Sequence, residues 1–228
     1  MNTIDSRYKA ITRNIHEACQ HYEREPGTVC LLAVSKGHST SDIAQLYELG
    51  QRQFGESYLH EALAKQQQLT KLNIVWHYIG RIQSNKTAAI AQHFSWVHSI
   101  DRIKIARRLN DQRGNNAPPL NICLQINLNQ EDSKGGVNES NALALAQEIA
   151  TLPNLQLRGL MALPQQETDF IKQRQTFARL RQLRDDLHNN GLVLDTLSMG
   201  MSNDYVAAIA EGSTHLRIGN VLFGSRQA

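Results

Sequence analysis

Three short stretches of this 228-residue chain carry groups that could react with or hold a small molecule. Lys36 follows an apolar run, Ser202 ends the sequence Met199-Gly-Met-Ser202, and Arg217 stands two residues before Gly219-Asn220. A lysine with reduced hydration forms Schiff bases with carbonyl compounds. Junctions that contain glycine expose backbone N–H groups, which bind anions. An amine, an anion site and an arginine suggest a site for a phosphorylated aldehyde, provided that the fold brings them together.

Each of these residues also has a purely structural explanation. Lys36 could end its strand in water, Arg217 could lie on the surface, and Ser202 could be only the N-cap of the following helix. The choice between the two explanations depends on where the secondary-structure elements place the side chains.

The hydrophobic pattern predicts an amphipathic helix followed by alternating strands and helices. Apolar residues recur at spacings of four and three from Ile4 to Tyr22, which is typical of one face of a helix. The predicted strands cover residues 28–35, 53–56, 74–79, 96–100, 121–128, 155–162, 193–199 and 214–218. The predicted helices fill the gaps at 40–50, 57–69, 85–93, 102–112, 139–151, 169–189 and 203–211.

This alternation predicts an α/β fold, namely a single (β/α)8 TIM-type barrel domain over residues 1–228 with an extra N-terminal helix. An open doubly wound sheet is the main competitor. In a barrel, functional residues gather at the carboxyl ends of the strands, and the loops after strands seven and eight are the usual phosphate site. Strand eight closes beside strand one, so we expect Lys36, Ser202 and Gly219-Asn220 to converge at one rim.

Composition and spacing argue against several other classes of protein. The 24 basic and 21 acidic residues are mixed along the chain, and the basic stretch Arg102–Arg113 lacks the interleaved aromatic residues of a nucleic-acid surface. The longest apolar run, Val29–Val34, is far shorter than the ~18 residues of a membrane span. The nine histidines show no metal-site spacing, so we expect no metal. The three widely spaced cysteines fit free thiols in a reducing compartment, which predicts a cytoplasmic protein.

Short motifs occur in order along nearly the whole chain. They are Leu32-Ala-Val-Ser-Lys36, Phe54-Gly-Glu-Ser57, Trp76-His-Tyr-Ile-Gly80, Gln83-Ser-Asn-Lys86, Arg158-Gly-Leu-Met161, Ser198-Met-Gly-Met-Ser202 and Arg217-Ile-Gly219. With these motifs the chain resembles the pyridoxal phosphate homeostasis protein family. The resemblance implies a barrel similar to the N-terminal domain of alanine racemase, fold type III, which holds pyridoxal 5′-phosphate (PLP).

The resemblance also implies roles for residues at matching positions. Lys36 would form the internal aldimine with PLP, and Arg217 would face the pyridine nitrogen. Ser202 would bind the phosphate, together with the backbone N–H groups of Gly219 and Asn220. The complete set of cofactor-binding residues that it implies is Lys36, Ser57, Met161, Ser202, Arg217, Gly219 and Asn220.

Three positions depart from the family pattern. Ser57 stands where asparagine is usual, and Gly37 and Asn220 stand where threonine is usual. Loss of a threonine hydroxyl removes one hydrogen bond to a charged group, worth ~1.5–3 kcal/mol. A barrel that has lost cofactor binding is therefore one alternative.

Arginine stays protonated, and beside the pyridine nitrogen it weakens the electron sink of PLP chemistry, which argues against transamination and leaves proton transfer such as racemisation. Racemisation by two bases also needs a second acid or base, which alanine racemase takes from an extra β-domain. Only four residues follow Gly224, so we expect no such domain. We therefore predict a protein without catalytic residues that carries or buffers PLP in vitamin B6 homeostasis. The alternative is a small fold type III PLP enzyme such as an amino-acid racemase.

The expected partners are PLP itself and the PLP-dependent apo-enzymes that receive it, with no nucleic acid and no membrane. We expect the protein to be a monomer. The stretch Ser133–Gly136 follows strand five, where it could form a solvent loop or place Lys134 as a second aldehyde site.

Overall fold

The computed structural model describes residues 3–114, 117–128 and 135–224 and shows eight parallel strands that close into a barrel. The strands are β1 (Cys30–Val34), β2 (Gln53–Glu56), β3 (Val75–Tyr78), β4 (Trp96–Ile100), β5 (Leu120–Ile126), β6 (Leu155–Ala162), β7 (Thr196–Ser198) and β8 (His215–Ile218). Each strand pairs with the next, and β8 pairs back to β1 with Cys30 opposite His215 and Ala33 opposite Ile218. The predicted closed barrel is confirmed, and the alternative of an open doubly wound sheet is wrong.

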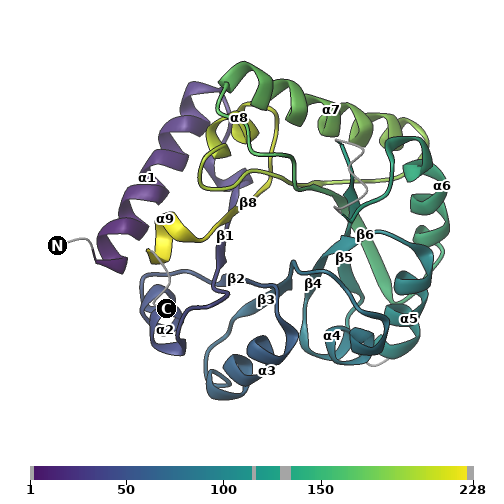
Figure 1. The fold of residues 1–228 in the computed structure, drawn as a ribbon, viewed down its shortest axis with the longest axis horizontal. Helices are drawn as coiled ribbons and strands as arrows, with labels where there is room; N and C mark the ends of the chain where they lie inside the picture. The colour runs from purple at the N-terminus through teal and green to yellow at the C-terminus, as the bar shows by residue number, and fades with distance from the viewer. Residues whose placement is uncertain (1–2, 115–116, 129–134, 225–228) are drawn as a thin grey trace.

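The helices form a ring outside the strands (Figure 1). They are α1 (Ile4–His21), α2 (Thr40–Glu48), α3 (Leu59–Gln68), α4 (Thr87–His93), α5 (Ile103–Arg113), α6 (Glu139–Ala150), α7 (Phe170–Asn189), α8 (Tyr205–Ala210) and α9 (Asn220–Phe223), with 3-10 turns η1 (Pro26–Thr28) and η2 (Ser84–Lys86). The predicted N-terminal helix is confirmed as α1, which buries Ile11, Ile15, Ala18 and Cys19. The sequence pattern did not predict α9 or the two 3-10 turns.

Helix α8 begins at Tyr205, two residues later than predicted, because a turn precedes it. Asp204 Oδ1 accepts the N–H of Met201 at 2.5 Å, and the N–H of Asp204 donates to the carbonyl oxygen of Met201 at 3.2 Å. Asp204 is consequently the N-cap residue of α8. The explanation of Ser202 as the N-cap is therefore wrong, since Ser202 lies inside the turn.

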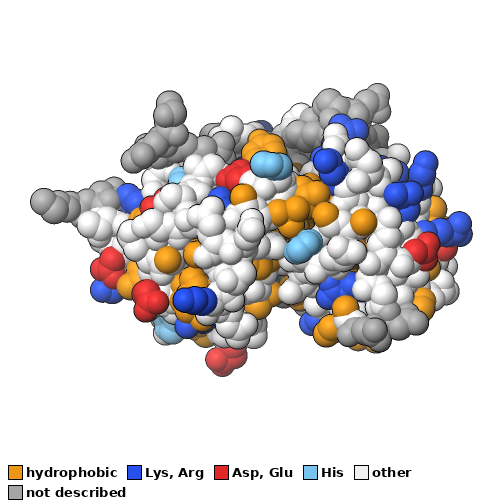
Figure 2. Space-filling view, turned by 90° about the horizontal axis from the view of Figure 1, so that it is seen from below, with side chains coloured by type: hydrophobic (Ala, Val, Ile, Leu, Met, Phe, Trp, Pro, Cys, Tyr) orange, Lys and Arg blue, Asp and Glu red, His pale blue; other side chains and the backbone are white. Residues whose placement is uncertain are grey.

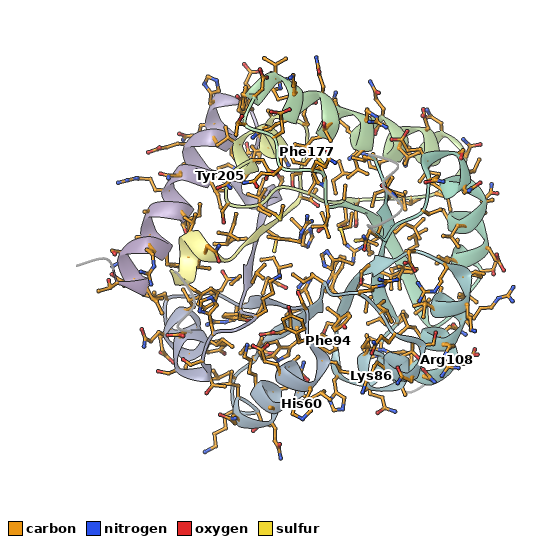
Figure 3. All side chains as sticks on the ribbon, in the orientation of Figure 1. His60, Lys86, Phe94, Arg108, Phe177 and Tyr205 are labelled. Carbon is orange, nitrogen blue, oxygen red and sulfur yellow. The ribbon has the colours of Figure 1, made fainter. Side chains whose placement is uncertain are left out.

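Two layers of side chains fill the molecule, one between the strands and the helices and one inside the barrel (Figure 3). Phe94 and Phe177 belong to the outer layer and are about 2% and 1% exposed, whereas His60 and Lys86 lie at the periphery. Within the barrel, His98 of β4 contacts Ser198 of β7 across the interior. The outer layer is apolar and the inner layer is partly polar, as expected when the top of a barrel binds a ligand.

Helix α1 supports the seam where the barrel closes. The Arg7 guanidinium donates to the carbonyl oxygens of Leu222 at 2.9 Å and Phe223 at 2.7 Å, at the end of α9. Figure 1 shows α1 and α9 side by side, and the two helices are in contact. The extra N-terminal helix thus holds the short helix that follows β8.

The basic helix α5 uses its arginines to bind neighbouring parts of the fold. Arg113 donates to the carbonyl oxygens of Ala91 at 2.5 Å and Phe94 at 2.8 Å, and Arg108 donates to Thr87 Oγ1 at 3.1 Å. On the side of the molecule in Figure 2, basic and acidic side chains both occur, interspersed with apolar ones. The contacts of Arg108 and Arg113 give part of the basic stretch Arg102–Arg113 a structural role.

Two further observations bear on the sequence predictions. None of the helices in the described part of the chain combines the length and hydropathy that crossing a membrane requires.

Cys19, Cys30 and Cys123 are all free thiols, and burial raises the pKa of each; for Cys30 it reaches about 12. These thiols are consequently poor nucleophiles at neutral pH.

Candidate functional site

A cavity of about 390 Å³ opens at the carboxyl ends of the strands, where the barrel fold predicts the site. Six of the seven predicted cofactor residues line it: Lys36, Ser57, Ser202, Arg217, Gly219 and Asn220. Met161, the seventh, is fully buried on β6 and is not part of the cavity surface. The fold therefore brings six of the residues together, and their role toward a cofactor stays a prediction.

A buried ion-pair cluster holds the chain next to Lys36. The Lys65 ammonium, on α3, donates to the carbonyl oxygen of Ser35 at 2.6 Å. It also donates to the Oε1 atoms of Glu56 at 2.8 Å and Glu61 at 2.5 Å. An ammonium has three protons to donate, and all three are used here. Lys65 is therefore held as a cation and is not available as a nucleophilic amine.

The carboxylates of this cluster bind the residues on both sides of Lys36. Glu56 is fully buried, and its Oε1 atom also accepts the Ser35 hydroxyl proton at 2.7 Å. Burial raises the pKa of Glu56, although the hydrogen bonds from Lys65 and Ser35 oppose the change. Glu61 accepts the N–H of Gly37 at 2.6 Å. Gly37 has φ +74°, a left-handed conformation that favours glycine.

Two backbone turns form the opposite wall of the cavity. Across residues 3–114, 117–128 and 135–224 we find no acceptor for the backbone N–H groups of Ser202, Gly219 and Asn220. These three donors are therefore available to the oxygen atoms of an anion. Asp204 also lines the cavity, and burial raises the pKa of its carboxyl group. Its Oδ1 atom is used by the N–H of Met201.

Gly200 is the residue that lets the first of these turns lie against the barrel. Its φ is +95°, and a Cβ atom at this position would lie 2.6 Å from Ala208 Cβ and 2.9 Å from Leu216 Cδ2. The carbonyl oxygen of Gly200 accepts the N–H of Arg217 at 2.9 Å. Glycine is therefore required both for the conformation and for the close approach of the turn to α8 and β8.

Arg217 points into the barrel and not to the surface. It is 4% exposed, and Nη1 donates to the carbonyl oxygen of Ser198 at 2.6 Å and to Ser198 Oγ at 2.8 Å. Nη2 donates to the carbonyl oxygen of Ala162 at 2.7 Å. Burial lowers the pKa of Arg217 to about 10, so the side chain stays cationic at neutral pH. The explanation of Arg217 as a surface arginine is wrong.

Lys36 is half-buried and lines the cavity, which also contradicts its explanation as a strand end in water. The apolar part of the wall comes from Ile79 after β3 and from Leu163 and Pro164 after β6. Leu163 is 37% exposed, and so is Met201 at the rim. The cavity therefore has an apolar wall and an open mouth.

The sequence analysis missed the residues that support the site. Glu56 carried a signal, because a carboxylate inside a buried strand requires a partner. Lys65 carried none, since a lysine on an amphipathic helix usually lies in solvent. Lys134 lies outside the described residues. The described part of the chain shows no group of three or more His, Cys, Asp or Glu residues that could hold a metal ion.

Comparisons with known proteins show which family this barrel resembles. The family model "Alanine racemase, N-terminal domain" matches residues 6–227. A pyridoxal phosphate homeostasis protein from Pseudomonas aeruginosa is 52% identical over 226 residues, which cover 99% of this chain and 97% of that protein. The structure of PipY from Synechococcus elongatus with PLP bound is similar, with a TM-score of 0.85, 34% identity and coverage of 97% of this chain and 100% of PipY.

An alanine racemase from Corynebacterium glutamicum has a TM-score of 0.70 but only 17% identity, over 96% of this chain and 62% of the racemase. This likeness shows a shared fold alone. The fold and the cavity thus define a barrel of the alanine racemase N-terminal domain type. Within this class, the chain belongs to the pyridoxal phosphate homeostasis protein family, as its motifs predicted.

Proposed function

We propose that this chain binds PLP in the cavity with the Lys36 amine as its covalent anchor, and that it serves PLP homeostasis as a carrier or buffer. One observation carries the proposal: an amine, three available backbone donors and a buried guanidinium all face a single cavity of about 390 Å³. The name of the Pseudomonas relative and the PLP bound to PipY support the same ligand.

The residues of the cavity fit PLP in charge and chemistry. PLP supplies an aldehyde that condenses with a primary amine, and it carries a phosphate and a pyridine nitrogen. Lys36 provides the amine, and the N–H groups of Ser202, Gly219 and Asn220 provide donors for the phosphate. Arg217 has N–H groups left for the ring, because Nε and one Nη2 proton have no acceptor among the described residues.

Arg217 also bears on whether the chain only binds PLP or uses it in catalysis. A guanidinium next to the ring nitrogen disfavours protonation of that nitrogen, because two positive charges would lie close together in a buried site. An unprotonated ring withdraws electrons weakly from a bound amino acid. Arg217 therefore disfavours reactions that need a strong electron sink, such as transamination, and leaves racemisation as the alternative to simple binding.

The remaining titratable groups of the cavity disfavour racemisation. Besides Lys36 and Arg217, the described lining residues include His38, Glu167 and Asp204 but no tyrosine. His38 leaves β1 on the same loop as Lys36, and its ring stacks on Phe223 with centroids 4.4 Å apart. Glu167 accepts the backbone N–H groups of Thr168 and Asp169, and Asp204 accepts the N–H of Met201. The titratable lining groups of the described chain are thus engaged in structural contacts, which disfavours their use as the second base of racemisation.

Loading of the apo-protein tests PLP binding. Titration with PLP is expected to give one equivalent of visible absorbance, and borohydride reduction followed by peptide mapping is expected to find the label on Lys36. Lys36→Ala should remove the label from that peptide, whereas the matched variant Lys86→Ala, on the periphery, should load like the wild type. A wild-type label on a different peptide would contradict the proposal.

Exchange in heavy water tests the absence of turnover. The loaded protein is incubated with amino acids, and deuterium at their α-carbons is measured. We expect no exchange above that of free PLP, because the titratable groups that line the described part of the cavity are engaged in structural contacts. Sustained exchange that disappears in Lys36→Ala would favour the amino-acid racemase instead.

We extend the proposal to the partners of the chain. PLP-dependent apo-enzymes receive the cofactor, and the chain acts as a monomer in the cytoplasm. The open mouth that the described residues leave at the cavity supports transfer to an incoming amine. Mixing the loaded protein with an apo-enzyme should restore the activity of that enzyme in proportion to the PLP lost, and size-exclusion chromatography should give the monomer mass.

A further inference from the structure

A chain of buried hydrogen bonds runs from Arg217 across the interior of the barrel. Arg217 Nη1 donates to Ser198 Oγ at 2.8 Å, and Ser198 Oγ lies 2.8 Å from His98 Nδ1. His98 Nε2 lies 2.9 Å from His77 Nδ1, and His77 Nε2 lies 2.6 Å from Gln53 Oε1. The chain links β8, β7, β4, β3 and β2, and its serine and both histidines are fully buried.

The direction of every bond in this chain follows from the groups at its two ends. A guanidinium donates and never accepts, so Ser198 Oγ accepts from Arg217, and among the described residues only His98 Nδ1 is placed to accept the Ser198 hydroxyl proton. His98 then has its proton on Nε2 and donates to His77 Nδ1. His77 in turn donates from Nε2 to Gln53 Oε1, which can only accept. Both histidines are therefore neutral, with the proton on Nε2.

The surroundings of the chain keep the histidines neutral. Burial and the nearby His215 lower the pKa of His77 well below its ordinary value. Burial lowers the pKa of His98 similarly, helped by His77, His215 and Arg217. His215 of β8 faces both rings at centroid distances of 6.0 and 5.7 Å, and burial lowers its own pKa to about 4. Trp96 stacks on His77, with the centroids 5.5 Å apart.

The chain restricts the position of the arginine. Ser198 accepts a hydrogen bond from the guanidinium, and His98 fixes the direction of the Ser198 hydroxyl. This contact and the bond from Nη2 to the Ala162 carbonyl oxygen hold one edge of the guanidinium inside the barrel. A reversed hydroxyl would point its proton at the cation, which is electrostatically unfavourable. The unbonded N–H groups are thus available in one orientation.

We propose that Ser198, His98 and His77 are positioning residues that hold Arg217 as an oriented hydrogen-bond donor toward the ligand in the cavity. The role toward PLP rests on the proposed function. The histidines act through the Ser198 hydroxyl and touch neither Lys36 nor the anion site. Their effect falls on the ring of the ligand and not on its phosphate.

The first test measures the direction of the bonds in the PLP-free protein, so it does not depend on PLP binding. Nitrogen-15 NMR of the histidine rings at pH 7 is expected to show His77 and His98 as neutral Nε2–H tautomers. A Nδ1–H tautomer or an imidazolium at either position would overturn the proposal. If the wild type took up no PLP, the proposed function would fall and this measurement would still decide the direction of the bonds.

The second test breaks the chain at its contact with Arg217. Ser198→Ala removes the hydroxyl but keeps the backbone carbonyl that binds Nη1. We expect about tenfold weaker PLP binding, as for one lost hydrogen bond to a charged group, and a shifted pH midpoint of the visible absorbance.

Ser99→Ala is the matched control, since Ser99 is a buried serine whose hydroxyl donates to the carbonyl oxygen of Gly80 at 2.5 Å, away from Arg217. It should bind PLP within about twofold of the wild type and keep the absorbance midpoint. Unchanged affinity and an unchanged midpoint in Ser198→Ala would show that the chain only fills the core. If Ser198→Ala failed to fold, the tautomer measurement would decide.

Discussion

Lys36 and Lys65 both lie close to Ser35, but their surroundings give them different chemistry. Lys65 donates to three oxygen atoms and is held as a cation, whereas Lys36 faces the cavity. The buried cation balances the fully buried Glu56 and fixes the chain next to Lys36. Lys65 thus has a structural role beside the lysine that we propose as the anchor of PLP.

Removing the structural lysine should destabilise the protein strongly. Lys65→Met leaves Glu56 buried without a counter-charge, and we expect a loss of about 3–5 kcal/mol in the free energy of unfolding, measured with urea. Lys9→Met is the control, because it breaks an exposed pair with Asp5 that contributes about 0–1 kcal/mol. Equal effects of the two substitutions would contradict this account of Lys65.

The defect of Lys65→Met should also depend on pH. The pKa of Glu56 is raised in the folded wild type, and loss of the Lys65 cation raises it further. A carboxyl group whose pKa is higher in the folded state binds its proton more tightly there, so its contribution favours folding at acid pH and is lost as pH rises. The difference from the wild type should therefore shrink between pH 7 and pH 5.

Ser202→Ala tests the phosphate side of the cavity. Loss of one hydrogen bond to a charged phosphate is expected to weaken PLP binding by ~1.5–3 kcal/mol, roughly 10- to 150-fold in Kd, without a change in thermal stability. Ser84→Ala, in the turn η2 away from the cavity, should leave the affinity unchanged. An unaltered Kd for Ser202→Ala would remove its hydroxyl from the phosphate site.

At the scale of elements, the turn between β7 and α8 depends on Gly200. Its carbonyl holds the N–H of Arg217, and the backbone N–H of Ser202 follows two residues later. A side chain at position 200 would push the turn away from α8 and β8, and both the arginine and the anion site would move with it.

Gly200→Ala and Gly191→Ala form a matched pair for this turn. Both glycines have positive φ, +95° and +87°, but a Cβ atom at Gly191 meets nothing within 4 Å. We expect about 1 kcal/mol for Gly191→Ala from backbone strain, and about 1–3 kcal/mol more for Gly200→Ala from the clash. Thermal unfolding measures both. Equal losses would show that packing at Gly200 adds nothing.

The sequence predicted elements where the hydrophobic pattern was long and regular. It failed for short elements whose ends are set by one or two hydrogen bonds. The strands and the amphipathic helix α1 followed from apolar runs and spacing. Helix α9 has four residues, too few to show a period, and depends on Arg7 from the other end of the chain. The start of α8 depends on one bond from Met201 to Asp204.

The candidate site was predicted from strand ends, but its supporting contacts were not. Lys36, Ser202 and Gly219 could be placed because the barrel fixes where strand ends meet. The ion pair of Lys65 with Glu56 and the contact of His98 with Ser198 join elements distant in sequence. No local pattern records such partners, so only the structure shows them.

For the molecule as a whole, the buried histidines should make stability fall in acid. The pKa values of His77, His98 and His215 all lie below the ordinary 6.5 in the folded state, that of His215 at about 4. At these three positions the unfolded chain takes up protons below pH 6.5, whereas the folded chain does not. Their contribution to the free energy of unfolding is therefore fully present above this pH and is lost as pH falls below it.

Between its unfolded and folded pKa values, each histidine is expected to change the free energy of unfolding by about 1.4 kcal/mol per pH unit. Urea unfolding between pH 7.5 and pH 4.5 measures it. His215→Met should reduce the slope by the contribution of one histidine, whereas His60→Asn, at an exposed position, should leave it unchanged. A flat profile for the wild type would contradict the neutral state of the barrel interior.

The pairing of β8 with β1 has a consequence for newly made protein. Lys36 follows β1, whereas the proposed phosphate donors Ser202, Gly219 and Asn220 follow β7 and β8. Almost the entire chain must therefore leave the ribosome before one small molecule can contact both sides of the cavity. A ligand that contacts residues after both β1 and β8 stabilises the closed barrel by mass action. If the chain carries PLP as proposed, the concentration of PLP would govern the fraction of the protein in which the barrel is closed.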